Sequence, residues 1–186
     1  MKHLGTVRLE TENLILRPFT LEDAHDLYTN WASDDEVTKY LTWPTYGSLE
    51  DAKGRLDYLT GIYGDPNVYE WCIESKTNHE AIGSIAVVSL DESVSQAELG
   101  WCLGRKYWGQ GIMPEAAKEV IRFLFEEVGV ERICARHDVN NPKSGRVMRK
   151  VSMSYEGTLR QSARNNQGIV DLAVYSILKS EYKKMC

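Results

Sequence analysis

Apolar residues recur along the chain at two spacings, one typical of helices and one typical of strands. After Ser48, apolar residues three or four positions apart form one helical stripe: Leu49, Ala52, Leu56, Leu59 and Tyr63. Between 69 and 103, apolar residues instead alternate with polar ones or form short continuous runs. Polar stretches at 76–79 and 91–93 separate these runs, so this part is predicted to be an antiparallel meander of three strands.

The other segments give the predicted order of elements. Strands are expected at 13–17, 69–74, 81–90, 97–103, 132–137, 155–159 and 170–178. Helices are expected over 34–41 and after the start signals Thr20, Ser48, Pro114 and Asn141-Pro142. Gly129 is expected to end the helix that opens at Pro114, and the helix after Asn141-Pro142 is expected to reach about Val151. This order predicts one α/β (α+β) domain over residues 1–186, with no internal repeat.

Composition narrows the classes of protein. The 186 residues include 22 Lys and Arg against 27 Asp and Glu, so the net charge of −5 argues against nucleic acid as a partner. Neither a signal peptide nor a run of about 20 apolar residues is present, so we expect a cytoplasmic protein with no membrane partner. The four cysteines are scattered without metal-ligand spacing, which predicts reduced thiols and no metal: Cys72, Cys102, Cys134 and Cys186.

The run Gly109-Gln110-Gly111 lies between the strand predicted at 97–103 and the helix predicted to open at Pro114. A helix N-terminus presents unpaired backbone N–H groups and a partial positive charge, and glycines let phosphate oxygens approach the backbone. Taken alone, two glycines also fit a simple tight turn. The run is not a P-loop, because no Gly-Lys-Ser/Thr follows, and it lacks the third glycine of the dinucleotide fingerprint.

Taken together, several blocks across nearly the whole chain resemble the GNAT superfamily of N-acetyltransferases, in particular its RimJ/RimL-like branch of ribosomal-protein N-acetyltransferases. The blocks are Glu12-Asn13-Leu14-Ile15-Leu16-Arg17-Pro18-Phe19, Ala97-Glu98-Leu99-Gly100-Trp101, Tyr107-Trp108-Gly109-Gln110-Gly111 with Glu115-Ala116, Asn141-Pro142-Lys143-Ser144, Met148-Arg149-Lys150 and Asp171-Leu172-Ala173-Val174-Tyr175-Ser176-Ile177-Leu178. The resemblance implies a mixed, mostly antiparallel central sheet of about seven strands, flanked by helices and split between strands 4 and 5.

The same resemblance implies acetyl-CoA as the acyl donor. The backbone amides of residues 109–113 are expected to hold its pyrophosphate, and Asn141 is expected to reach the pantetheine arm. Two departures from the family pattern are Lys106, where many relatives carry Gln or Arg, and Ser152-Met153 in place of Gly-Phe. The residues expected to bind acetyl-CoA are Trp101, Cys102, Leu103, Lys106, Gly109, Gln110, Gly111, Ile112, Met113, Asn141 and Ser144.

Transfer to an amine requires a base, because the amine attacks only in its neutral form. Glu98 is the candidate base, directly or through a water, and the alternative is a solvated or Arg-paired carboxylate. Ser144 matches the position of a hydroxyl donor in this branch and is the candidate acid for the departing thiolate, or else a serine on the helix surface. Cys102 could in principle take the acyl group first, but a cysteine in an apolar strand favours inert packing.

The acceptor is expected near the first helices, where aromatic residues and the acidic run 34–36 suit a peptide or cationic amine. The candidate substrate-binding residues are Trp31, Tyr40, Trp43 and Tyr46, although such aromatics also commonly form core. The sequence thus predicts an N-acetyltransferase that acts by direct attack in a ternary complex, as a monomer or homodimer, on a protein N-terminus or a small amine. The alternative is a sensory domain that binds acyl-CoA without turnover.

Overall fold

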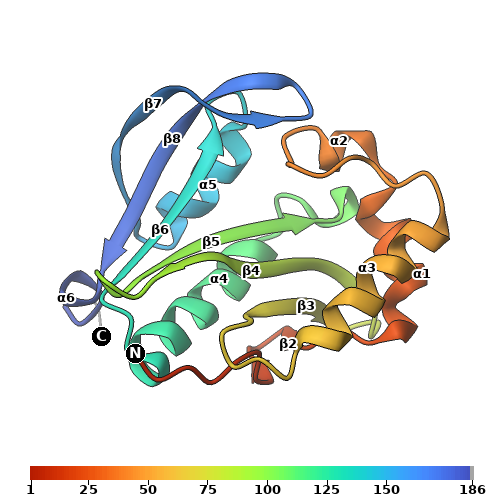
Figure 1. The fold of residues 1–186 in the computed structure, drawn as a ribbon, viewed down its shortest axis with the longest axis horizontal. Helices are drawn as coiled ribbons and strands as arrows, with labels where there is room; N and C mark the ends of the chain where they lie inside the picture. The colour runs from red at the N-terminus through yellow and green to blue at the C-terminus, as the bar shows by residue number, and fades with distance from the viewer. Residues whose placement is uncertain (185–186) are drawn as a thin grey trace.

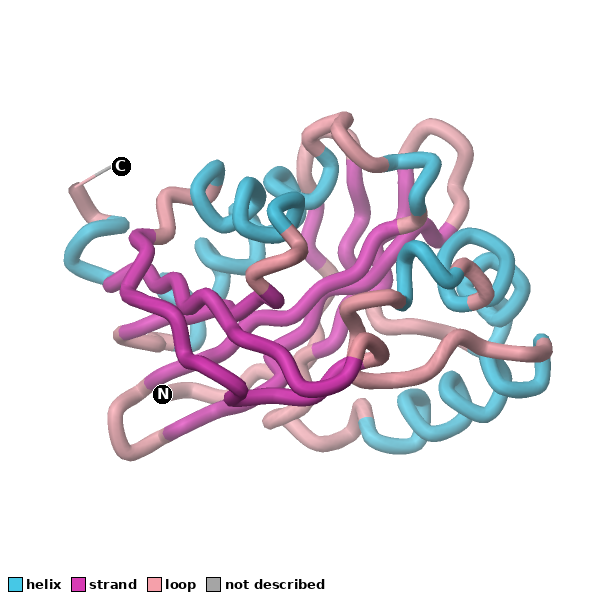
Figure 2. Tube along the Cα trace, turned by 90° about the horizontal axis from the view of Figure 1, so that it is seen from above, coloured by secondary structure: helices cyan, strands magenta, loops and turns pink. Residues whose placement is uncertain are grey.

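A computed structural model describes residues 1–184, which form a single eight-stranded sheet covered by helices on both faces (Figures 1 and 2). The strand order is β1-β2-β3-β4-β5-β6-β8-β7, and only β5 and β6 pair in parallel. The predicted mixed, mostly antiparallel sheet is therefore confirmed, with eight strands rather than seven. The strands are β1 Leu9–Glu10, β2 Leu14–Arg17, β3 Glu70–Ser75, β4 Ala81–Asp91, β5 Gln96–Leu103, β6 Arg132–Asp138, β7 Ser154–Asn165 and β8 Gly168–Leu178.

The helices divide into two groups by the sheet face that they cover. One face carries the first helices and α3, which pack on Cys72 and Ala81 of the sheet. The other face carries α4 and α5, which share one apolar core with residues from β1 to β6 and from β8. The helical elements are η1 Leu21–Asp23, α1 Ala24–Leu27, the π-turn η2 Tyr28–Ala32, α2 Asp35–Thr38, α3 Leu49–Ile62, η3 Arg105–Tyr107, α4 Ile112–Phe123, the π-turn η4 Leu124–Val128, α5 Pro142–Lys150 and α6 Lys179–Tyr182.

The start and stop signals expected from the sequence are found at most helix ends. Thr20 and Ser48 each form a capping box, with Asp23 and Asp51 respectively. Gly129 ends the α4–η4 segment with a φ of 85°, a left-handed conformation that glycine adopts without strain. Pro114 is an exception, because α4 begins two residues earlier, at Ile112. Proline is tolerated there because the first four N–H groups of a helix have no intrahelical acceptor.

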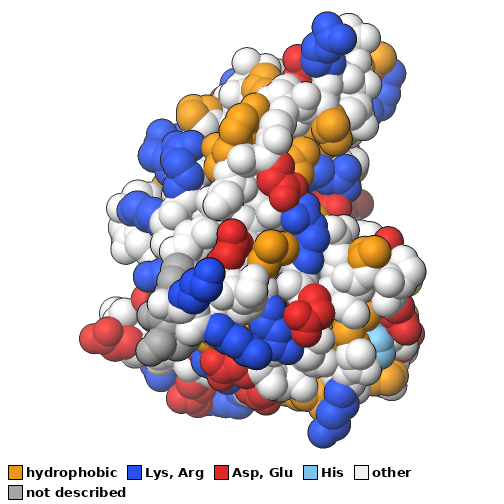
Figure 3. Space-filling view, turned by 90° about the vertical axis from the view of Figure 1, so that its left-hand side faces the viewer, with side chains coloured by type: hydrophobic (Ala, Val, Ile, Leu, Met, Phe, Trp, Pro, Cys, Tyr) orange, Lys and Arg blue, Asp and Glu red, His pale blue; other side chains and the backbone are white. Residues whose placement is uncertain are grey.

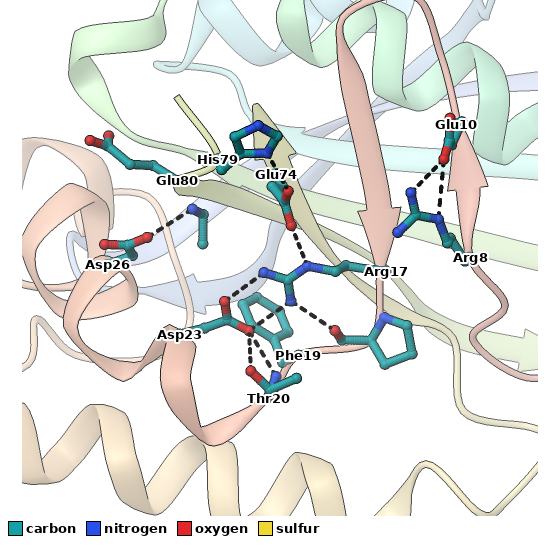
Figure 4. Close-up of polar contacts among 12 residues, drawn as sticks. Arg8, Glu10, Arg17, Phe19, Thr20, Asp23, Asp26, Glu74, His79 and Glu80 are labelled. Atoms are coloured by element: carbon teal, nitrogen blue, oxygen red, sulfur yellow. Dashed lines mark hydrogen bonds and ion pairs between the residues drawn. The ribbon is translucent and has the colours of Figure 1, made fainter. Parts of the chain in front are cut away.

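Arg17 joins β2 to the first helical turn and to β3 through its guanidinium group (Figure 4). Its Nη1 and Nη2 donate to the two carboxylate oxygens of Asp23, at 2.8 and 2.7 Å, and its Nε donates to Glu74. Nη1 also donates to the carbonyl of Pro18. The conspicuous block around Arg17 in the sequence thus has a structural role, because it fixes the first helices against the sheet edge.

The long β7–β8 hairpin reaches across to the segment around α2. Asn166, in the turn of the hairpin, donates from Nδ2 to the carbonyls of Thr38 at 2.9 Å and Trp43 at 2.8 Å. Its backbone N–H donates to the carbonyl of Leu41 at 3.2 Å. In Figure 1 the hairpin turn and α2 accordingly face each other above the far end of β5. These contacts hold the segment after α2, which forms one wall of the cavity described next.

Candidate active site

The parallel strands β5 and β6 pair over only half of their length and then separate. Ladder pairs run from Gln96↔Arg132 to Leu99↔Ala135, and none follows. Beyond Leu99, β5 still pairs with β4 on its other side, as far as Gly83↔Leu103. Figure 1 shows the two strands starting side by side and diverging toward α2 and the hairpin turn. The predicted split between the fourth and fifth strands of the expected sheet is confirmed, and residues 100–103 have an open edge on that side.

The loop that follows β5 turns sharply into α4 through two left-handed glycines. Gly109 has a φ of 78° and Gly111 a φ of 84°, values that other residues rarely adopt. Glu115 N–H donates to the carbonyl of Gly111, which is the first intrahelical bond, so the amides before it belong to the unpaired N-terminal set of α4. Gln110 Nε2 donates to the carbonyl of Lys106 at 2.8 Å, which closes the loop on itself. The geometry provides an anion site at the N-terminus of α4.

A cavity of about 540 Å³ lies at the split. The end of β5, the glycine loop, the start of α4, α5 and the α2 segment line it. Its volume is within the range of about 300–1,000 Å³ typical of small-molecule sites. It includes most of the residues expected at the donor site: Trp101, Cys102, Leu103, Gly109, Gly111, Ile112, Met113, Asn141 and Ser144. Lys106 and Gln110 do not line it.

Comparison with known proteins identifies the family. The family profile described as "Acetyltransferase (GNAT) domain" matches residues 13–154. The chain belongs to the GNAT acetyltransferase family. The uncharacterized N-acetyltransferase p20 of Bacillus licheniformis is 32% identical over 174 residues, covering 94% of this chain and 97% of the relative. The uncharacterized N-acetyltransferase YoaA of Bacillus subtilis is 33% identical over 171 residues, covering 92% and 96% respectively.

Among solved structures, RimL, a ribosomal L7/L12 α-N-protein acetyltransferase in complex with coenzyme A, has the same fold. Its TM-score is 0.82 at 19% identity, and the match covers 92% of this chain and 98% of RimL. The likeness to RimL shows a shared fold, and the expected resemblance to the GNAT family and its ribosomal-protein acetyltransferases is confirmed by the sequence and structure comparisons together. This protein is accordingly an enzyme, an acyltransferase of the GNAT type.

Asn141 and Ser144 lie at the start of α5 and face the cavity of the GNAT domain. The Asn141 side-chain oxygen accepts from the backbone N–H of Ser144, so Asn141 caps α5 while its Nδ2 remains available. The Ser144 hydroxyl makes no hydrogen bond to any residue in the described part of the chain. Both side chains are therefore free to donate toward a molecule in the cavity.

Glu98 lies where β5 and β6 are still paired, opposite Cys134, and does not line the cavity. Its two carboxylate oxygens accept from Arg136 Nε at 2.7 Å and Nη2 at 2.6 Å, a bidentate pair in which 13% of the Glu98 side chain is exposed. The hydrogen bond to Glu98 is the main reason that the Arg136 pKa is raised. The role of Glu98 as a base stays a prediction, and Arg136 is the partner from which it would have to be freed.

Cys102 lines the cavity but has the properties of a packing residue. Burial raises its pKa to about 11, although a hydrogen-bond contact with Ser84 acts in the opposite direction. Such a thiol is protonated at neutral pH and is a weak nucleophile. This supports direct transfer over a cysteine-bound acyl group. Cys72 and Cys134 are also free thiols, and Cys186 lies outside the described residues.

The four aromatic residues expected at the acceptor site lie in different places. Tyr40 lines the cavity. Trp43 and Tyr46 contact each other, with ring centroids 5.2 Å apart, outside the cavity lining. Trp31 is 2% exposed and packs against Phe19, so the structure places this indole in the core rather than on a substrate surface.

The acidic run next to these aromatics is also divided. Asp34 caps α2 and pairs with Arg105 at 2.9 Å, and Asp35 accepts from Thr45. Glu36 lines the cavity. It is the acidic residue of the run that a ligand in the cavity can reach.

Basic residues on α5 were missed by the sequence-based prediction. Lys143, Arg146 and Lys150 line the cavity, and Lys143 Nζ lies 3.7 Å from the centroid of the Trp108 ring. Their spacing of three and then four residues in a helix without acidic residues was the available signal. No group of three His, Cys, Asp or Glu side chains within residues 1–184 is arranged to hold a metal ion. None of the helices in that range is long and apolar enough to cross a membrane.

Proposed function

We propose that this GNAT enzyme transfers an acetyl group from acetyl-CoA to a primary amine, by direct attack in a ternary complex. The observation that carries the proposal is the open edge of β5 at the split, which leads directly to the glycine loop and the N-terminus of α4. A thioester arm and an anionic pyrophosphate need these two features in this order along one cavity. The amides of residues 109–113 bind the pyrophosphate, and Asn141 Nδ2 donates to the pantetheine arm.

The reaction needs three further contributions from the chain. The amine nitrogen attacks the thioester carbon, the C–S bond breaks, and the proton lost by the amine passes to Glu98, directly or through a water. A backbone N–H in residues 101–103 donates to the carbonyl oxygen as negative charge develops on it. Ser144 donates a proton to the departing thiolate and recovers one from solvent.

The acceptor is a protein N-terminal α-amine or a small-molecule amine. The similarity in fold to RimL, an α-N-protein acetyltransferase, supports an α-amine. Glu36 and Tyr40 in the cavity lining supply a carboxylate and an aromatic face, which suit an ammonium group before it loses its proton. An α-amine also has the lower unperturbed pKa, about 8 against about 10.4 for lysine, so less of it must be deprotonated by the base.

The test combines binding and turnover. The purified protein is titrated with acetyl-CoA and then incubated with peptides bearing free N-termini, with the same peptides N-terminally blocked, and with polyamines and amino acids, while free thiol is measured. Thiol release that depends on a free amine supports the proposal. Absence of CoA binding overturns it. Binding without thiol release on any acceptor supports the alternative, a cytoplasmic sensory domain that binds acyl-CoA without turnover.

A further inference from the structure

Helix α5 carries four basic residues and no acidic one among its nine residues. Lys143, Arg146 and Lys150 fall three and then four positions apart and line the cavity. The fourth, Arg149, points elsewhere and donates to the Tyr175 hydroxyl at 3.0 Å. One face of α5 thus forms a row of cations along one wall of the cavity.

Arg146 and Lys150 line the cavity without a partner among residues 1–184. Most other arginines are held by carboxylates, among them Arg17, Arg122 and Arg136. On the face shown in Figure 3, basic and acidic side chains lie beside one another in the same way over its lower half. Neither Arg146 nor Lys150 makes a hydrogen bond or ion pair with any residue in 1–184, although the chain has more acidic than basic residues.

The cavity lining itself is also short of negative charge. Glu36 is the one acidic residue among the lining residues of the described chain, and it belongs to the α2 wall rather than to α5. Lys143 lies over the Trp108 ring, beside the glycine loop. Two cations therefore remain unpaired on the part of α5 beyond Lys143, which favours a ligand with a second anionic group in addition to the one at the loop.

We propose that Arg146 and Lys150 bind the 3′-phosphate of the CoA adenosine and that the enzyme thereby distinguishes CoA from 3′-dephospho-CoA. The inference rests on the proposed function, which places the pyrophosphate at residues 109–113. Lys143 lies next to that loop, and the helix rise places Arg146 and Lys150 about 4.5 and about 10 Å further along α5. Both are exposed, so they lie at the mouth of the cavity, where the adenosine end of the molecule remains. A phosphate monoester carries about −2 charge and accepts a bidentate arginine.

The experiment compares the affinities of CoA and 3′-dephospho-CoA by calorimetry. We expect the wild-type protein to bind CoA about tenfold more tightly, a preference of the size that one or two charge-assisted hydrogen bonds give at an exposed site. The Arg146→Gln/Lys150→Gln variant is expected to bind both ligands within about twofold of each other, with unchanged affinity for 3′-dephospho-CoA. Arg146→Lys and Lys150→Arg keep the charge and should retain most of the preference.

Lys118→Gln is the control for the loss of a positive charge outside the site, because Lys118 is exposed on α4 and does not line the cavity. This control should keep the full preference for CoA. Equal binding of the two ligands by the wild-type protein, or a preference that survives in the double variant, would overturn the inference while leaving the proposed function intact. Failure to bind either ligand would overturn both. Unchanged circular dichroism confirms that each variant is folded.

Discussion

Arg17 shows how one residue of a conspicuous sequence block can be structural rather than catalytic. Its side chain is 20% exposed, and it neutralises Asp23 and Glu74, whose side chains are 7% and 13% exposed. Replacing it with methionine would leave two largely buried carboxylates unpaired, so we expect Arg17→Met to lower the free energy of unfolding by about 3 kcal/mol. Urea denaturation measures the change. Lys53→Met, which removes an exposed pair with Glu50, should change it by less than about 1 kcal/mol, and an equal effect of the two would contradict this role.

For Glu98, the sequence predicts a catalytic base, whereas the structure shows an ion pair with Arg136. If its carboxylate accepts the amine proton, Glu98→Gln should lower kcat/KM by about 10²- to 10⁴-fold. Arg136→Gln removes the same ion pair but keeps the carboxylate, so it should retain most of the rate. Rates are measured by thiol release across pH 6–9. Equal losses in both variants would show that the pair is only structural.

At the scale of elements, the turn of the β7–β8 hairpin holds the segment after α2 through Asn166. Asn166→Ala removes the two side-chain hydrogen bonds to the carbonyls of Thr38 and Trp43, so this wall of the cavity should loosen. We expect faster amide hydrogen exchange in residues 38–46 and a raised KM for the acceptor, with little change in the affinity for CoA. Gln167→Ala, one residue further along the same turn, is the control. Unchanged exchange in the Asn166 variant would show that other contacts hold the segment.

The elements that the sequence predicted well are those with a local physical signal. Capping residues such as Ser48 fix helix starts, and the meander of β3, β4 and β5 follows from its apolar runs and polar turns. Strand β7 extends to Asn165 rather than 159, because it lies at the sheet edge with most of its side chains exposed and therefore lacks an apolar alternation. In the site, the glycine loop was predictable from the two glycines of residues 109–111 and the helix start signal at Pro114. The sequence allowed an Arg-paired Glu98 but did not identify Arg136 as the partner, because that depends on the register between two strands that are far apart in the chain.

At the scale of the whole molecule, the pKa shifts predict how stability depends on pH on the acidic side. Hydrogen bonds from Arg132 and then Ser176 lower the pKa of Glu156 to about 2, and hydrogen bonds also lower the pKa values of Glu10 and Asp91. Because the unfolded carboxylates titrate near pH 4, this contribution is complete above that pH and is lost as the pH falls toward 2. The free energy of unfolding should therefore decrease between pH 5 and pH 2.

The cysteine thiols predict a loss of stability on the alkaline side, because their pKa values are raised rather than lowered by folding. Burial raises the pKa of Cys102 to about 11 and also raises those of Cys72 and Cys134, whereas an unfolded thiol titrates near 8.5. Their contribution is therefore complete below about pH 8.5 and is lost as the pH rises toward 11. Urea unfolding at pH 3, 5, 7 and 9.5 should thus show a plateau from about 5 to 8 that falls on both sides. Glu156→Gln should flatten only the acidic limb and Cys134→Ala only the alkaline limb, since each removes a group that titrates on one side. Equal stability at pH 3 and pH 7 would contradict the native-state pairing of these carboxylates.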